Sequence, residues 1–157
     1  VPVMKSLVVA FSWTAPTTFL PICHASLPVD AVTGIVGIFF FFQVFINTVI
    51  FDMRDVEGDV ASGVKTIPTM LGIRRTLILL TGVNLIIGTP LLLVSGFLSG
   101  PCSALLLAAG VVYAQGYLLC FPRFGTEKFF FELLTDGEFI VLGGIFYLFI
   151  RAMPYSV

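Results

Sequence analysis

The stretch that decides the fold is FDMRDVEGDVASGVKTIPTMLGIRR, residues Phe51–Arg75, the only long polar run in a chain that is 58% hydrophobic. Four of the nine acidic residues of the chain fall within eight positions of it, and four of the eight basic residues share the stretch. The acidic residues are Asp52, Asp55, Glu57 and Asp59, and the basic residues are Arg54, Lys65, Arg74 and Arg75. A charged run that directly follows a long apolar stretch predicts a loop at a membrane surface.

The three aspartates are spaced three and then four residues apart. On a helix this spacing places Asp52, Asp55 and Asp59 on one face, so their carboxylates point into the same volume. Three like charges repel one another unless a cation lies among them, and oxygen-only ligands suit a hard ion such as Mg²⁺. The alternative is a solvated loop whose charges only keep two helices out of the lipid. The residues that predict bends in the segment are Gly58, Gly63 and Pro68.

The composition predicts an all-α, polytopic membrane protein. Of the 157 residues only 11% are charged and 14% are aromatic, and the mean hydropathy is +1.09, which no soluble domain approaches. We expect one membrane domain over residues 1–157, with residues 52–75 as its aspartate-rich loop. The net charge of −1 gives no reason to expect a nucleic-acid partner.

Five apolar stretches are long enough, or nearly so, to cross a hydrocarbon core of about 30 Å as helices of about 20 residues. They are Leu7–Cys23, Ala31–Phe51, Thr76–Phe97, Ser103–Phe121 and Asp136–Met153. The last is the shortest, and an earlier start in the preceding FFFELL would lengthen it. If the aspartate loop lies inside, all the Lys and Arg residues except Arg151 lie inside as well, so the loop is expected on the cytosolic, stromal or matrix side.

Polar side chains within the spans are few. Gln43 and Asn47 are four residues apart, and a polar stripe in lipid is expected to face a protein interior or water. They are either cavity-lining residues or partners in hydrogen bonds between helices. Asp136 and Glu138 start the last span, where negative charge suits the N-terminal end of a helix.

The segment DMRDVEGDVASGVKTIPTMLG resembles the second aspartate-rich motif of the UbiA-type intramembrane prenyltransferases. The family pattern is D-x-x-D-x-x-x-D, followed by a G-x-K/R-T/S element, then L/I-P and L-G. The matching residues are Asp52, Asp55, Asp59, Gly63, Lys65, Thr66, Pro68 and Gly72. The V-E-G-D variant at residues 56–59 is similar to homogentisate-type and archaeal lipid-synthesising members. It is also close to chlorophyll synthases, although these tend to lack the acid corresponding to Asp55.

Family members have nine transmembrane helices, and this chain resembles helices five to nine. The resemblance implies that Mg²⁺ binds the diphosphate of an isoprenoid donor, and that a hydrophobic acceptor, often an aromatic ring, captures the allylic carbocation. It assigns Asp55 and Asp59 as metal ligands, with Asp52 as a third ligand or a residue behind them. It makes Lys65, with Arg54, a contact of the diphosphate, so the residues carrying catalysis are Asp55, Asp59 and Lys65.

In the family the first aspartate motif, N-D-x-x-D, completes the metal site, and this sequence contains no such pattern. We therefore do not expect the chain to be active alone, and two hypotheses stay open. The chain is either the C-terminal part of a Mg²⁺-dependent prenyltransferase or a truncated, non-catalytic subunit of a larger membrane complex. Either way it needs a partner, the missing N-terminal half or other membrane subunits, because a half-bundle would turn Gln43 and Asn47 toward lipid. Quinone, tocopherol, chlorophyll or lipid biosynthesis is the expected setting, and a plastid membrane is favoured.

Overall fold

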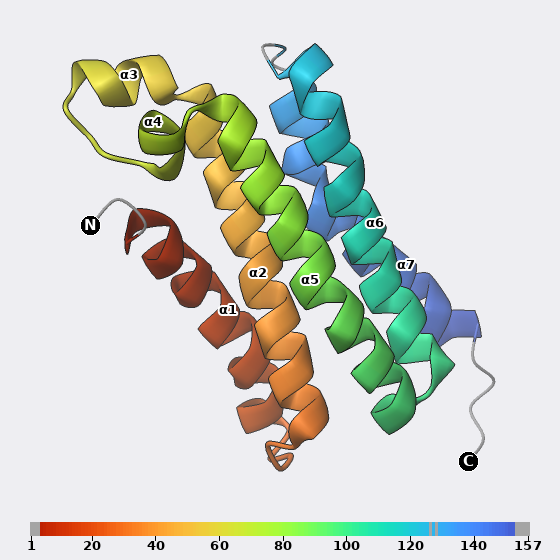
Figure 1. The fold of residues 1–157 in the computed structure, drawn as a ribbon. Helices are drawn as coiled ribbons and strands as arrows, with labels where there is room; N and C mark the ends of the chain where they lie inside the picture. The colour runs from red at the N-terminus through yellow and green to blue at the C-terminus, as the bar shows by residue number, and fades with distance from the viewer. Residues whose placement is uncertain (1–3, 126, 128, 153–157) are drawn as a thin grey trace.

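The computed structural model describes residues 4–125, 127 and 129–152, and all regular secondary structure in this part of the chain is helical (Figure 1). The long helices are α1 (Met4–His24), α2 (Ala31–Arg54), α5 (Ile73–Ser99), α6 (Pro101–Phe124) and α7 (Gly137–Ala152). The short elements are α3 (Val56–Ala61), α4 (Ile67–Leu71) and a π-helix, η1 (Phe130–Thr135). The all-α fold expected from the composition is therefore confirmed.

Each predicted span coincides with one of the long helices. Within the described residues, α1, α2, α5 and α6 are long and apolar enough to cross a membrane. Helix α7 has 16 residues and a length of about 24 Å, which is short for a hydrocarbon core of about 30 Å. The π-helix η1 directly precedes it, in the segment where an earlier start was expected, and so extends the helical path.

The chain runs back and forth between two ends of the bundle (Figure 1). One end carries the start of α1, the end of α2, the short helices α3 and α4, and the end of α6. Among the residues with described side chains, every Lys and Arg belongs to this end, which we call the aspartate end. They are Lys5, Arg54, Lys65, Arg74, Arg75 and Arg123.

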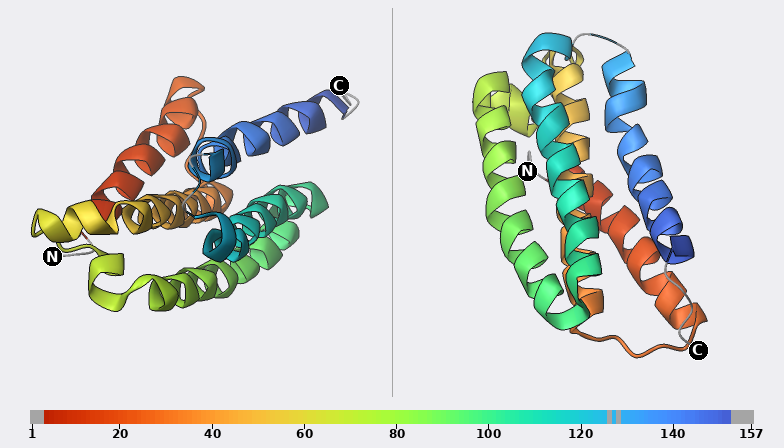
Figure 2. Two further views of the ribbon diagram at one scale, coloured as in Figure 1. Left: turned by 90° about the horizontal axis from the view of Figure 1, so that it is seen from above. Right: turned by 90° about the vertical axis from the view of Figure 1, so that its right-hand side faces the viewer.

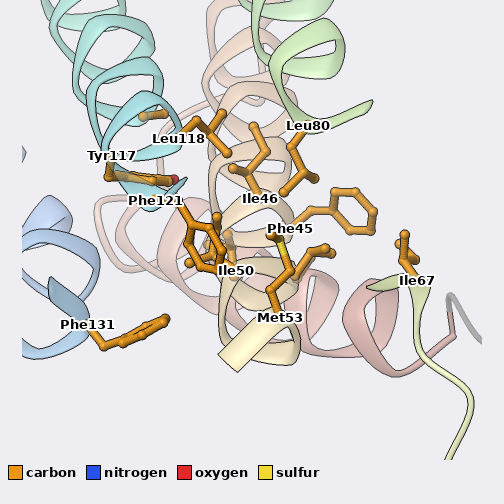
Figure 3. Packing of buried hydrophobic residues seen from close by; sticks show 14 of the residues in the cluster. Phe45, Ile46, Ile50, Met53, Ile67, Leu80, Tyr117, Leu118, Phe121 and Phe131 are labelled. Atoms are coloured by element: carbon orange, nitrogen blue, oxygen red, sulfur yellow. The ribbon is translucent and has the colours of Figure 1, made fainter. Parts of the chain in front are cut away.

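Helix α2 is the central element. Half of its apolar stretch is buried inside the protein, against 22% of that of α1 and 17% of that of α5. Figure 3 shows Ile46, Ile50 and Met53 of α2 facing Leu80 of α5 and Phe121 of α6. Because α1, α5 and α6 all pack on α2, the position of the aspartates at its end is set by the core of the bundle.

Local chemistry explains where the long helices begin and end. Helix α2 begins after Asp30, whose carboxylate accepts hydrogen bonds from the backbone N–H and the hydroxyl of Thr33, both at 2.8 Å. Helix α5 ends at Ser99. The next residue is Gly100, whose φ of +87° is accessible to glycine, and Pro101 then starts α6, where its missing N–H is not needed.

Candidate functional site

The three aspartates do not lie on one straight helix, so that expectation from their spacing is wrong. Helix α2 ends at Arg54, and the chain bends at Asp55 before α3 begins at Val56 (Figure 1). Asp52 is therefore in the last turn of α2, and Asp59 is in α3. Beyond them, Gly63 turns the chain with a φ of +66° and Pro68 lies in the first turn of α4, as their residue types predicted, whereas Gly58 lies inside α3.

Asp52 is buried and bonded to α1. Its side chain is 2% exposed, and its two oxygens accept from different groups. The Lys5 ammonium donates to Oδ1 at 2.7 Å, and the Ser6 hydroxyl donates to Oδ2 at 3.0 Å. Because both oxygens have partners on α1, Asp52 is suited to hold the start of α1 against the end of α2.

Asp55 is half exposed and paired with Arg54. The guanidinium donates Nε and Nη2 to the two carboxylate oxygens at 2.8 and 3.2 Å, a bidentate arrangement. This hydrogen bonding lowers the pKa of Asp55, and the nearby charge of Lys5 acts in the same direction, so the carboxylate is ionised at neutral pH. The same guanidinium lies over the rings of Phe51 and Phe131, 4.9 and 5.2 Å from their centroids.

Of the three aspartates, Asp59 has the side-chain oxygen that is best placed to bind a cation. Its Oδ2 is shielded from solvent, yet it has no hydrogen-bond partner among the described residues. The backbone N–H of Asp59 donates to the carbonyl of Asp55 at 2.9 Å, so the two acids are one helical turn apart. Lys65, the third predicted catalytic residue, lies exposed between α3 and α4.

These acids fit a magnesium ion only in part. Within the residues that the structure describes, no three His, Cys, Asp or Glu side chains form a group that could hold a metal by themselves. However, Mg²⁺ in phosphate sites commonly takes one or two carboxylates and completes its shell with waters and phosphate oxygens. The unpartnered oxygen of Asp59 and the ionised, half-exposed Asp55 are donors of that kind, although Asp55 would have to exchange a bond to Arg54 for the ion, whereas Asp52 is buried with both oxygens bonded to α1.

A cavity of about 500 Å³ lies between α1, α2 and α7 and reaches the aspartate end. Seen from above, α1 and α7 lie on the same side of α2 and diverge from each other (Figure 2). Four aromatic rings line the cavity, from Trp13, Phe40, Phe51 and Phe139. Since Phe51 also lies beneath the Arg54 guanidinium, which pairs with Asp55, this ring connects the cavity to the Arg54–Asp55 pair.

Gln43 and Asn47 are both buried, at 2% and 9% exposure, by helices of this same chain. The expectation that a half-bundle would turn them toward lipid is therefore wrong. Only Asn47 lines the cavity of about 500 Å³, where its amide donates to the carbonyl of Thr135 at 2.8 Å. Gln43 lies instead in a narrow crevice between α2 and α5. Of the two predicted cavity residues, Asn47 therefore lies at the cavity between α1, α2 and α7, and Gln43 lies at the contact between α2 and α5.

Glu138 was expected only to favour the start of a helix, and the structure gives it a different place. It lies in the first turn of α7 but is fully buried, and its Oε2 accepts from the Tyr117 hydroxyl at 3.3 Å. The Asn47 amide also approaches this carboxylate. The sequence signal that could have found it is a lone acid in an apolar span, which in membrane proteins marks a functional site by default.

The family profile described as the UbiA prenyltransferase family matches residues 2–134. The matched segment includes α1 to α6, the aspartate loop and most of η1. No curated protein and no solved structure matches the chain. The apolar helices make the chain an integral membrane protein, and the family match identifies it as one of the prenyltransferase type. This chain therefore belongs to the UbiA prenyltransferase family.

Proposed function

We propose that this chain supplies one side of the active site of a Mg²⁺-dependent prenyltransferase that moves an isoprenoid from its diphosphate to a hydrophobic acceptor. The observation that carries the proposal is the solvent-shielded, unpartnered Oδ2 of Asp59, one turn from the ionised Asp55. An unsatisfied buried oxygen costs about 1–3 kcal/mol, so its presence favours a ligand role over a purely structural one.

In this proposal Asp55 and Asp59 hold the metal ion. When bound, Mg²⁺ neutralises the negative charge that develops on the diphosphate as the allylic C–O bond breaks. Arg54 and Lys65 add positive charge on the same side and orient the diphosphate. Asp52 does not contact the ion in this proposal. Its hydrogen bonds to Lys5 and Ser6 fix the end of α2, and thereby the position of Asp55.

The cavity is the proposed place of the reacting carbon and the acceptor. Its aromatic rings keep water away from the carbocation, which would otherwise be hydrolysed. The other side of the diphosphate site is proposed to come from helices outside this chain, which carry the first aspartate motif of the family, N-D-x-x-D. Residues 56–59 resemble several kinds of family member and do not select the acceptor, so an aromatic acceptor is proposed because aromatic rings line the cavity.

The test is isoprenoid transfer by the complete enzyme carrying single substitutions. Asp55→Ala and Asp59→Ala should each lower the rate by at least about 100-fold, because each removes a group that stabilises developing charge. Expression should be unchanged. Glu57→Ala is the matched control, since Glu57 is an exposed acid on the same short helix. Near-normal transfer in both aspartate variants would exclude the assignment.

A further inference from the structure

A buried polar cluster borders the cavity at a place that the metal chemistry does not use. It consists of Asn47 on α2, Tyr117 on α6, and Thr135 and Glu138 around the junction of η1 and α7. All four residues are less than 10% exposed. Glu138 keeps one carboxylate oxygen, Oε1, without a hydrogen-bond partner among the described residues. Polar groups in the interior of a membrane protein are costly, so a cluster of this size calls for a role.

The cluster fixes which way the Asn47 amide points. Its nitrogen donates to the Thr135 carbonyl at 2.8 Å and lies near the Glu138 carboxylate. A carbonyl oxygen is an acceptor only, so the Thr135 carbonyl favours the amide nitrogen over the amide oxygen at that position. The Tyr117 hydroxyl in turn holds Glu138. The amide oxygen of Asn47 is therefore the group left to serve the cavity that Asn47 lines.

The Thr135 carbonyl lies at the end of the π-helix η1. In η1 the hydrogen bonds span five residues, as from the Asp136 N–H to the Phe131 carbonyl at 2.9 Å. The wider turn changes which carbonyls are used within the helix, and such single turns frequently occur at functional sites. The carbonyl of Thr135, the last residue of η1, accepts from Asn47 of the neighbouring helix.

The cavity suits a flat ring. Its volume of about 500 Å³ falls within the range of small-molecule sites, and aromatic side chains form much of its wall. Asn47 precedes Asp55 by eight residues, a rise of about 12 Å along α2. A ligand at Asn47 would therefore lie below the aspartates and not among them.

We propose that Asn47 accepts a hydrogen bond from the hydroxyl group of an aromatic ring bound in this cavity, and that Glu138, held by Tyr117, is a positioning residue for its amide. The inference rests on the proposed function, because the ring would be the acceptor of the isoprenoid. In addition, it states how the site selects this acceptor, through a hydrogen bond from the ring hydroxyl to Asn47. A site that presents one fixed acceptor oxygen should discriminate strongly against a ring whose hydroxyl is blocked.

The test measures binding and does not depend on turnover. Trp13 is the one tryptophan of the sequence and lines the cavity, so its fluorescence reports occupancy. The probes are 4-propylphenol and its O-methyl ether, titrated into the detergent-purified protein. Where the complete enzyme is used, the tryptophans of its helices outside this chain are replaced by phenylalanine. The phenol should bind at least about 10-fold more tightly than the ether, because the ether cannot donate to Asn47.

Asn47→Leu should bring this ratio close to 1. Glu138→Leu should lower it by at least about 3-fold, because it removes the side chain beside the Asn47 amide and leaves only the Thr135 carbonyl to hold that amide. Asn84→Leu is the matched control. Asn84 is also a buried membrane asparagine whose amide donates to a backbone carbonyl, that of Val111, at 2.9 Å, but it lies outside this cavity. Its variant should keep the wild-type ratio.

An unchanged ratio in Asn47→Leu would overturn the proposal, as would an equal loss in Asn84→Leu or fluorescence that responds to neither probe. If Asn47→Leu does not fold, Glu138→Leu decides the question alone, because an unchanged ratio there contradicts the positioning role. Failure of the proposed function would show differently, as the absence of metal-dependent transfer while the phenol still binds.

Discussion

Single residues at the aspartate end have separate tasks, although their spacing makes them look equivalent. Asp52 is 2% exposed and bonded through both oxygens to α1, whereas Asp55 is half exposed and paired with its neighbour Arg54. Asp59 alone has a shielded oxygen without a partner among the described residues. Burial and partners, and not position in the motif, therefore separate Asp52, which bonds α2 to α1, from Asp55, which is exposed and bonded only to its neighbour, and from Asp59, which keeps one oxygen unbonded.

The first prediction concerns the ion pair of Lys5 and Asp52. Lys5→Ala leaves the buried Asp52 carboxylate with only the Ser6 hydroxyl, so the free energy of unfolding should fall by about 1–3 kcal/mol, discounted because the lysine side chain is 52% exposed. Thermal unfolding in detergent measures the loss. Adding Asp52→Leu should recover part of it, because the unpaired charge is then gone. Equal stability of Lys5→Ala and Arg74→Ala, an exposed residue, would contradict this role.

At this scale the sequence could predict chemistry but not packing. The spacing of the aspartates and the family motif indicated an oxygen-ligand site at Asp55 and Asp59, which stays a prediction. The role of Glu138 could not be predicted, because its partners Tyr117 and Asn47 are 21 and 91 residues away and meet it only in the folded bundle. Spacing along one helix contains no information about such contacts.

Among the elements, the long helices were the easiest to predict and the bends the hardest. Apolar length determines a membrane helix, so the five spans coincide with α1, α2, α5, α6 and α7. The break at Asp55 contains neither glycine nor proline, and no local signal marks it. The π-helix likewise depends on how its residues pack, with Phe130 and Phe131 buried against Phe121 of α6.

The second prediction tests the contact between α5 and α6. A Cβ added at Gly88 would lie 2.6 Å from Cγ2 of Val111, a stiff side chain that cannot easily move. Gly88→Ala should therefore lower the free energy of unfolding by about 1–3 kcal/mol, as expected for overpacking. Gly82→Ala is the matched control, because it lies on the same helix with nothing within 4 Å of the added atom. The unfolding temperature in detergent compares the two, and equal temperatures would exclude a tight contact at Gly88.

For the whole molecule, the bundle is more complete than the sequence suggested. Gln43 and Asn47 are covered by this chain's own helices, so an open polar face is no longer a reason to require a partner. The reason that remains is chemical, because the family uses two aspartate motifs and this chain provides one. The described basic side chains gather at the aspartate end, which keeps the inner-side orientation of the loop as a prediction.

The central claim is that Asp55 and Asp59 hold a divalent cation at the mouth of the cavity. The most direct measurement is Mn²⁺ binding by the complete enzyme, followed by electron paramagnetic resonance with inorganic pyrophosphate present, since Mn²⁺ takes the same oxygen ligands as Mg²⁺. The account predicts that Asp55→Ala and Asp59→Ala each weaken Mn²⁺ binding at least about 10-fold, as known for lost ligand-shell residues, while Glu57→Ala binds like wild type. Equal Mn²⁺ affinity in wild type and both aspartate variants would contradict it.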